Sequence, residues 1–200
     1  MNGNLSSRML QTFVNEQIKK GAEAIGDHPK GLSLYNEKKR LHFVMIPKNA
    51  STSISIAALT SNKDSWTIST APSLEKVRYI VILRDPADRF ISATNMFLTT
   101  GKMLVNNLPL IVNNNLHTVD CHYQPQHMFI DSIPINDIDF FWYNKNVAEE
   151  IEQFYNLNFN HSNLDLNLGN KLVKEIDISI IKTLYAEDYK LINSVKFINI

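Results

Sequence analysis

An apolar run that stops at a proline and gives way to a loop of small residues dominates the sequence between Leu41 and Ile56. Residues 41–46 are rich in strand-forming side chains, which is typical of a buried β-strand. Pro47 has no amide hydrogen to donate to a ladder, so we expect the strand to end there. The residues after the loop predict a helix over Thr52–Leu59. The stretch therefore predicts a strand, a tight loop and a helix.

The loop after Pro47 combines a lysine with small residues, namely Lys48, Asn49, Ala50, Ser51, Thr52 and Ser53. Such a loop gathers backbone N–H groups and the positive end of a helix around one point, which makes an anion site. The lysine adds a charge, and the hydroxyls add adaptable donors. It is not a Walker A loop, because it lacks the glycines of G-x-x-x-x-G-K-[ST] and its lysine comes first. The alternative interpretation is an ordinary strand-to-helix turn with a surface lysine.

A second strand–loop–helix unit follows. Tyr79–Leu83 is a continuous apolar run, which favours a buried strand of a parallel sheet. Asp85 suits an N-cap and Pro86 suits the first helical position, so a helix begins here. Arg84 therefore lies at the carboxyl end of a strand, where open α/β sheets bind ligands. The alternative role for Arg84 is a structural salt bridge. Two such units in series predict an α/β domain.

Composition sets bounds on the domain and its partners. The chain has 200 residues, which make one domain with a real core. Its 20 Lys and Arg residues balance 20 Asp and Glu residues, which argues against a nucleic-acid partner. One cysteine, Cys121, excludes an internal disulfide. Neither an apolar signal region nor a run of 18 apolar residues occurs, so we expect a cytoplasmic protein without a transmembrane segment.

Periodicity and strand propensity predict further elements along the chain. We expect helices over Ser7–Ala24 and Ile178–Val195, and strands within Asp64–Thr70 and over Ile138–Tyr143. Asn146 and Glu149 have the spacing of a capping box at the start of another helix.

Polar side chains gather in residues 117–127. Their spacing predicts no metal site, because His122 and His127 are separated by Pro125, which breaks a helix. A lone histidine is more often structural than catalytic, so the residues alone do not select one.

Together these motifs resemble those of the PAPS-dependent sulfotransferases, particularly the carbohydrate (Golgi-type) branch; PAPS is 3′-phosphoadenosine 5′-phosphosulfate. The segment Ile46–Ser53 is similar to the family's 5′-phosphosulfate loop. Arg84 and Ser92, eight residues apart, are similar to the pair that holds the 3′-phosphate. The resemblance extends from about Leu41 to Val195, most of the chain.

Two weaker similarities follow. His122 with Pro125 and Gln126 resembles an H-x-x-P-Q stretch of several such enzymes, and Leu184–Tyr189 resembles their C-terminal helix. The sequence departs from the family pattern: we expect no transmembrane anchor like that of membrane-bound relatives, and the Arg-Lys-Gly clamp of cytosolic relatives is not found in it.

The resemblance implies a P-loop-like three-layer fold, in which helices flank a central parallel sheet, over a single domain of residues 1–200. Residues 1–40 form an N-terminal helix and lead-in in this interpretation, and residues 41–200 form the nucleotide-binding core. The implied activity is transfer of a sulfuryl group from PAPS to an acceptor hydroxyl, on a carbohydrate in this branch, by in-line displacement. PAP is the expected product, and no metal is expected.

The family motifs also imply roles for individual residues. Lys48 neutralises the leaving 5′-phosphate, a role worth roughly 3 to 4 kcal/mol by analogy with oxyanion donors. The loop residues bind the 5′-phosphosulfate, and Arg84 with Ser92 binds the 3′-phosphate. Arg89 either assists in binding the 3′-phosphate or is a surface residue. His122 is the expected base, since imidazole titrates near the working pH. His117, Asp120 and His127 compete with it for that role.

Two other functions stay open. A nucleotide kinase of P-loop type would show magnesium-dependent ATP turnover, but the missing GK[ST] and the lack of an obvious magnesium carboxylate count against it. A non-catalytic module would bind PAP without transferring sulfate to any hydroxyl. The sequence identifies neither the acceptor nor the oligomeric state.

Overall fold

The structure is a computed structural model of the chain, and it describes residues 33–61, 63–69, 76–99, 121–161 and 178–199. The helix expected over Ser7–Ala24 and the candidate bases His117 and Asp120 lie outside the described residues. Within them the chain has a mixed α/β fold built on one five-stranded sheet of order β3-β1-β2-β4-β5. The strands are β1 (Ser33–Asn36), β2 (Leu41–Val44), β3 (Trp66–Ser69), β4 (Arg78–Leu83) and β5 (Ile138–Trp142).

The sheet is mixed, which differs from the parallel sheet expected. β2, β4 and β5 run parallel, whereas β1 pairs antiparallel with both β2 and β3. β1 and β2 are joined by a tight turn at residues 37–40, and strands joined so closely must be antiparallel. The prediction of a parallel sheet is therefore right for three strands and wrong for the other two.

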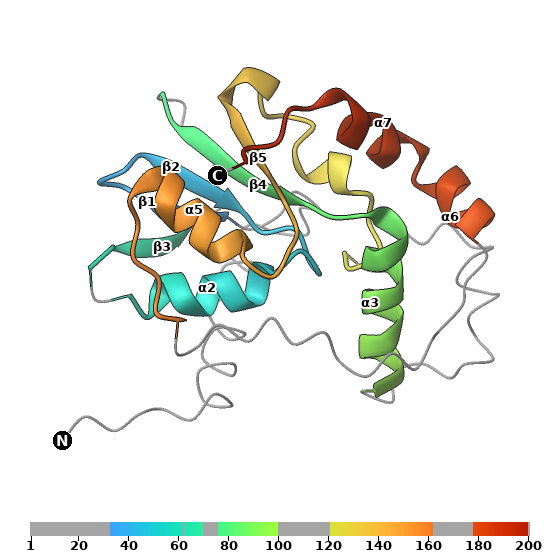
Figure 1. Cartoon of the computed structure of the whole chain (residues 1–200), viewed down its shortest axis with the longest axis horizontal. Coiled ribbons are helices and arrows are strands. Elements are labelled where there is room, and N and C mark those ends of the chain that lie inside the picture. The colour runs from blue at the N-terminus through green and yellow to red at the C-terminus, as the bar shows by residue number, and fades with distance from the viewer. Residues whose placement is uncertain (1–32, 62, 70–75, 100–120, 162–177, 200) are drawn as a thin grey trace.

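A helix follows each of the three parallel strands (Figure 1). These are α2 (Ser51–Leu59), α3 (Pro86–Thr99) and α5 (Val147–Tyr155), and the described chain ends with α6 (Ile178–Leu184) and α7 (Ala186–Ser194). Two short 3₁₀ helices, η3 (Gln126–Phe129) and η4 (Ile135–Asp137), precede β5. No helix in these ranges is long and apolar enough to cross a bilayer.

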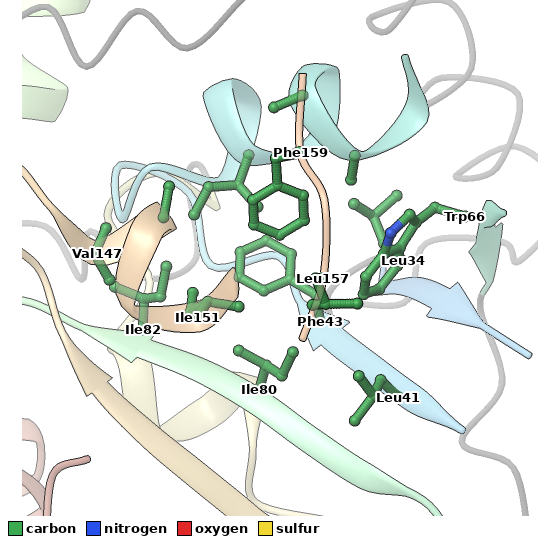
Figure 2. Close-up of a cluster of buried hydrophobic side chains, with 14 of the residues drawn as sticks. Leu34, Leu41, Phe43, Trp66, Ile80, Ile82, Val147, Ile151, Leu157 and Phe159 are labelled. Carbon is green, nitrogen blue, oxygen red and sulfur yellow. The ribbon is translucent and has the colours of Figure 1, made fainter. Parts of the chain in front are cut away.

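Alternating side chains of the parallel strands form two cores, one on each face of the sheet. On one face, Phe43 and Ile80 pack with Val147 and Ile151 of α5 and with residues of α2 (Figure 2). On the other face, Val81 and its neighbours pack with η3 and with the partly buried side chains of α7. Parallel strands buried on both faces account for the continuous apolar runs in the sequence.

The start of α3 confirms the predicted cap. Asp85 Oδ1 accepts hydrogen bonds from the backbone N–H groups of Ala87 (2.9 Å) and Asp88 (3.0 Å). The capping box predicted at Asn146 does not form, because that side chain makes no cap hydrogen bond. Asn144 takes part instead: its Oδ1 accepts from the N–H of Asn146 (2.6 Å).

The single helix predicted over Ile178–Val195 is instead two helices, α6 and α7, separated at Tyr185. The backbone of Tyr185 is not helical, with φ −111° and ψ 29°. Its buried hydroxyl donates to the carbonyl of Tyr123 (2.6 Å), a contact far along the chain that periodicity does not reveal. The break sets the direction of α7, whose first turn reaches η3.

Candidate anion-binding site

The loop between β2 and α2 has an unusual backbone. Two of its non-glycine residues lie in the left-handed region, Lys48 with φ 69° and Ala50 with φ 61°. Few non-glycine residues adopt this conformation, and it is concentrated at functional sites. Ala50 is the N-cap of α2, which has neither a side-chain cap nor an acidic residue in its first turn. Because the first amides of a helix have no partner within it, the loop offers N–H donors to an anion.

The hydroxyl residues predicted for this site lie at the start of α2. Ser51 is buried, and Thr52 and Ser53 are half-buried. Asn49 differs, because it is only 1% exposed and its Nδ2 is used within the protein. That nitrogen donates to the carbonyl of Ile82 (2.7 Å) and to Gln126 Oε1 (2.6 Å). Asn49 therefore ties the loop to β4.

Arg84 joins the second motif to this loop. Its Nη1 donates to the carbonyl of Lys48 at 3.1 Å, and its guanidinium lies 4.4 Å from the ring centre of Tyr143. The Arg84 Nε is buried and has no hydrogen-bond partner within the described ranges. A buried unpaired donor indicates a place for an acceptor such as a ligand oxygen or a water.

Three cations lie close enough to affect one another. Burial lowers the pKa of Lys48, and the charges of Arg84 and Arg89 lower it further. Among the residues that the structure describes, no carboxylate forms an ion pair with any of the three. A bound anion would relieve this repulsion, because an opposite charge favours the protonated form of Lys48.

Arg89 is a structural residue of the site, not a surface one. It is 1% exposed, and burial lowers its pKa. It donates from Nε to the carbonyl of Pro47 (2.9 Å), from Nη1 to that of Gln124 (2.6 Å) and from Nη2 to that of Cys121 (3.3 Å). Arg89 thus binds the loop and the segment 121–124 to α3.

The other predicted site residues have different surroundings. Ser92 is half-buried on α3, and over the described ranges its hydroxyl has no hydrogen-bond partner. His122 is half-buried, with Nδ1 3.8 Å from Cys121 Sγ. The structure therefore brings the loop and Arg84 together, and within the described residues Ser92 makes no hydrogen bond to either.

Two residues that sequence reasoning did not select complete the site. Gln126 and Asp188 are both fully buried, with 0% exposure. Gln126 Oε1 accepts from the N–H of Arg84 (3.0 Å), and Gln126 Nε2 donates to its carbonyl (2.8 Å). Asp188 accepts from the N–H groups of Gln126 (2.7 Å) and His127 (2.9 Å). The two weaker family similarities contain these residues, but only the fold shows that they meet.

His127 is paired with Asp188, and this pairing predicts its titration. The hydrogen bond between His127 Nδ1 and Asp188 Oδ1 (2.8 Å) raises the pKa of His127 above its ordinary 6.5. The folded state therefore binds more protons than the unfolded state between the two pKa values. The resulting stabilisation is fully present below the unfolded pKa and is lost as pH rises through the folded pKa.

We expect an NMR titration to place the imidazole pKa of His127 above 6.5 and that of His42 below it, since burial lowers the pKa of His42. His42 is stacked between Tyr35 and Tyr79, so it serves as an internal contrast. In His127→Gln, the free energy of unfolding should fall less than in the wild type as pH rises above the unfolded pKa. A His127 pKa at or below 6.5 would contradict the pairing.

No protein-family model, curated protein or solved structure matches this chain. In the ranges that the structure covers, no group of three or more His, Cys, Asp or Glu side chains could hold a metal ion. The interpretation of the site therefore depends on its own geometry and on the sequence motifs.

Proposed function

We propose that the protein is a sulfotransferase that moves a sulfuryl group from PAPS to a hydroxyl of a carbohydrate acceptor. The observation that carries this proposal is the hydrogen bond from Arg84 Nη1 to the carbonyl of Lys48 (3.1 Å). It joins the two nucleotide-binding motifs at the carboxyl ends of neighbouring parallel strands, where α/β sheets bind ligands. A site to which both motifs contribute suits a nucleotide that carries phosphates at two positions, 5′ and 3′.

A P-loop-like three-layer fold is part of the proposal. The parallel strands β2, β4 and β5, each followed by a helix, support it. So does the packing of α2 and α5 on one face of the sheet and of η3 and α7 on the other. The antiparallel β1 and β3 extend this arrangement at one edge.

The proposed reaction is an in-line displacement at sulfur. The acceptor oxygen forms a bond to sulfur while the bond from sulfur to the 5′-phosphate oxygen breaks, and the electron pair of that bond stays on the phosphate. Lys48 and the first amides of α2 would stabilise this charge, an effect of about 3 to 4 kcal/mol for an oxyanion donor. His122 would take the hydroxyl proton. Arg84 and Ser92 would hold the 3′-phosphate.

Thermal unfolding with PAP, ADP or no ligand tests the donor site. A ligand at 100 times its Kd adds about 2.7 kcal/mol, which should raise Tm by roughly 5 to 10 °C for a chain of this size. We expect PAP to stabilise the wild type well beyond ADP, and Arg84→Ala to abolish the difference. Arg78→Ala is the matched control: Arg78 begins the same strand and pairs with Asp139 instead.

The outcomes separate the competing functions. Loss of the PAP response in Arg84→Ala but not in Arg78→Ala would support the site, and sulfate transfer from PAPS to a panel of saccharides would then test catalysis. PAP binding without transfer would favour a non-catalytic module. Equal responses to PAP and ADP, with magnesium-dependent ATP turnover, would favour a kinase. No response to either nucleotide would overturn the proposal.

A further inference from the structure

β2 and β4 separate where the anion site begins. Their register runs to the pair Phe43 and Ile80, but β4 continues to Leu83. The carbonyl of Leu83 accepts from the N–H of Tyr143 beyond the end of β5 (2.8 Å). Successive peptide groups of a strand point to opposite sides. The backbone groups of Ile82 and Arg84 therefore point toward β2, at a level where β2 no longer pairs with β4. Their backbone groups need other partners, since buried peptide groups are rarely left unpaired.

Two side-chain amides supply those partners. Asn49 Nδ2 donates to the carbonyl of Ile82 (2.7 Å), and Gln126 pairs with both the N–H (3.0 Å) and the carbonyl (2.8 Å) of Arg84. Gln126 Oε1 also accepts from Asn49 Nδ2 (2.6 Å). Gln126 is thus in contact with the anion loop on one side and with the Arg84 backbone on the other. Asp188 of α7 anchors Gln126 by accepting a hydrogen bond from the Gln126 backbone N–H (2.7 Å).

We propose that Gln126 is a positioning residue that sets the separation between the loop of Lys48 and the guanidinium of Arg84. This inference rests on the proposed function, because the separation matters for a ligand with anionic groups at both places. Gln126 is fully buried and its amide is engaged within the protein, so it acts through Arg84 and Asn49. Its effect should therefore be on selectivity for the 3′-phosphate, not on nucleotide affinity in general.

The test compares Gln126→Met, which keeps the length of the side chain and removes its hydrogen bonds, with Gln126→Glu. The glutamate keeps an acceptor for Arg84 N–H but places an oxygen against the Arg84 carbonyl. Gln124→Met is the matched control, because the buried Gln124 Oε1 has no hydrogen-bond partner within the described residues. Calorimetric titration gives the ratio of Kd for ADP to Kd for PAP. We expect Gln126→Met to lower this ratio about tenfold, the equivalent of about one hydrogen bond.

A second readout needs no ligand: hydrogen exchange at the Arg84 amide. We expect exchange to be faster in Gln126→Met than in the wild type and in Gln124→Met. If the methionine variant does not fold, Gln126→Glu carries both measurements. An unchanged ratio of dissociation constants, in a wild type that prefers PAP, overturns the inference and leaves the proposed function standing.

A wild type that binds no PAP overturns the proposed function and the selectivity role with it. The exchange measurement then decides the structural part. Faster exchange at Arg84 in the Gln126 variant alone supports positioning by Gln126, and unchanged exchange overturns it.

Discussion

Arg89→Met should lower the free energy of unfolding by about 3 to 5 kcal/mol, because the buried guanidinium holds several backbone carbonyls at once. The guanidinium donates to three backbone carbonyls, those of Pro47, Cys121 and Gln124. All three carbonyls would lose a donor in the variant, and each of these part-buried hydrogen bonds contributes about 1 to 1.5 kcal/mol. The loss is large beside a total stability of about 5 to 15 kcal/mol.

Urea unfolding followed by circular dichroism measures this loss. Arg89→Lys should keep the charge and still lose most of the stabilisation, because a single ammonium cannot reproduce the planar fork of donors. Lys190→Met is the control for removing a cation, since Lys190 forms an exposed pair with Glu187 and should contribute less than about 1 kcal/mol. A loss below about 1 kcal/mol in Arg89→Met would show that the three contacts do not hold the loop.

Asp188→Asn should destabilise the fold by about 2 to 4 kcal/mol, although the two side chains have nearly the same shape. The buried carboxylate accepts from the N–H groups of Gln126 and His127 and from the His127 ring. An amide in its place turns an NH₂ group toward one of these donors. At least one buried N–H group then has no acceptor.

The same urea titration measures the effect, and hydrogen exchange at the Gln126 and His127 amides locates it. Glu187→Gln is a matched control, because it makes the same chemical change one residue away on an exposed side chain. Equal stabilities for Asp188→Asn and Glu187→Gln would contradict the role assigned to Asp188.

Local patterns in the sequence predicted the elements that hold the site. A continuous apolar run predicted β4, strand propensity predicted β5, and Asp85 with Pro86 predicted the start of α3. The apolar run over residues 41–46 predicted β2, which ends at Val44. There the chain turns, with the Ile46 N–H donating to the Val44 carbonyl (3.0 Å). These features depend on neighbours in the sequence, so they can be read from it.

The features that depend on distant contacts were missed. β1 is only four residues long, Ser33–Asn36, and half of them are buried, so its apolar signal is weak. The break at Tyr185 interrupts an apolar periodicity that continues through it. Gln126 and Asp188 carry ordinary polar side chains, and their roles arise from a contact across 62 residues. No spacing rule relates residues so far apart.

That long-range contact has a consequence for how the protein folds. The Gln126 side chain joins residues 42 positions apart when it meets Arg84, and its backbone joins residues 62 positions apart when it meets Asp188. Contacts of such high contact order form only after large loops have closed, which makes them late events. The nascent chain can therefore build the β2–β4 pair before the anion site exists. Completion of the site then requires Gln126 and, further along the chain, Asp188 of α7.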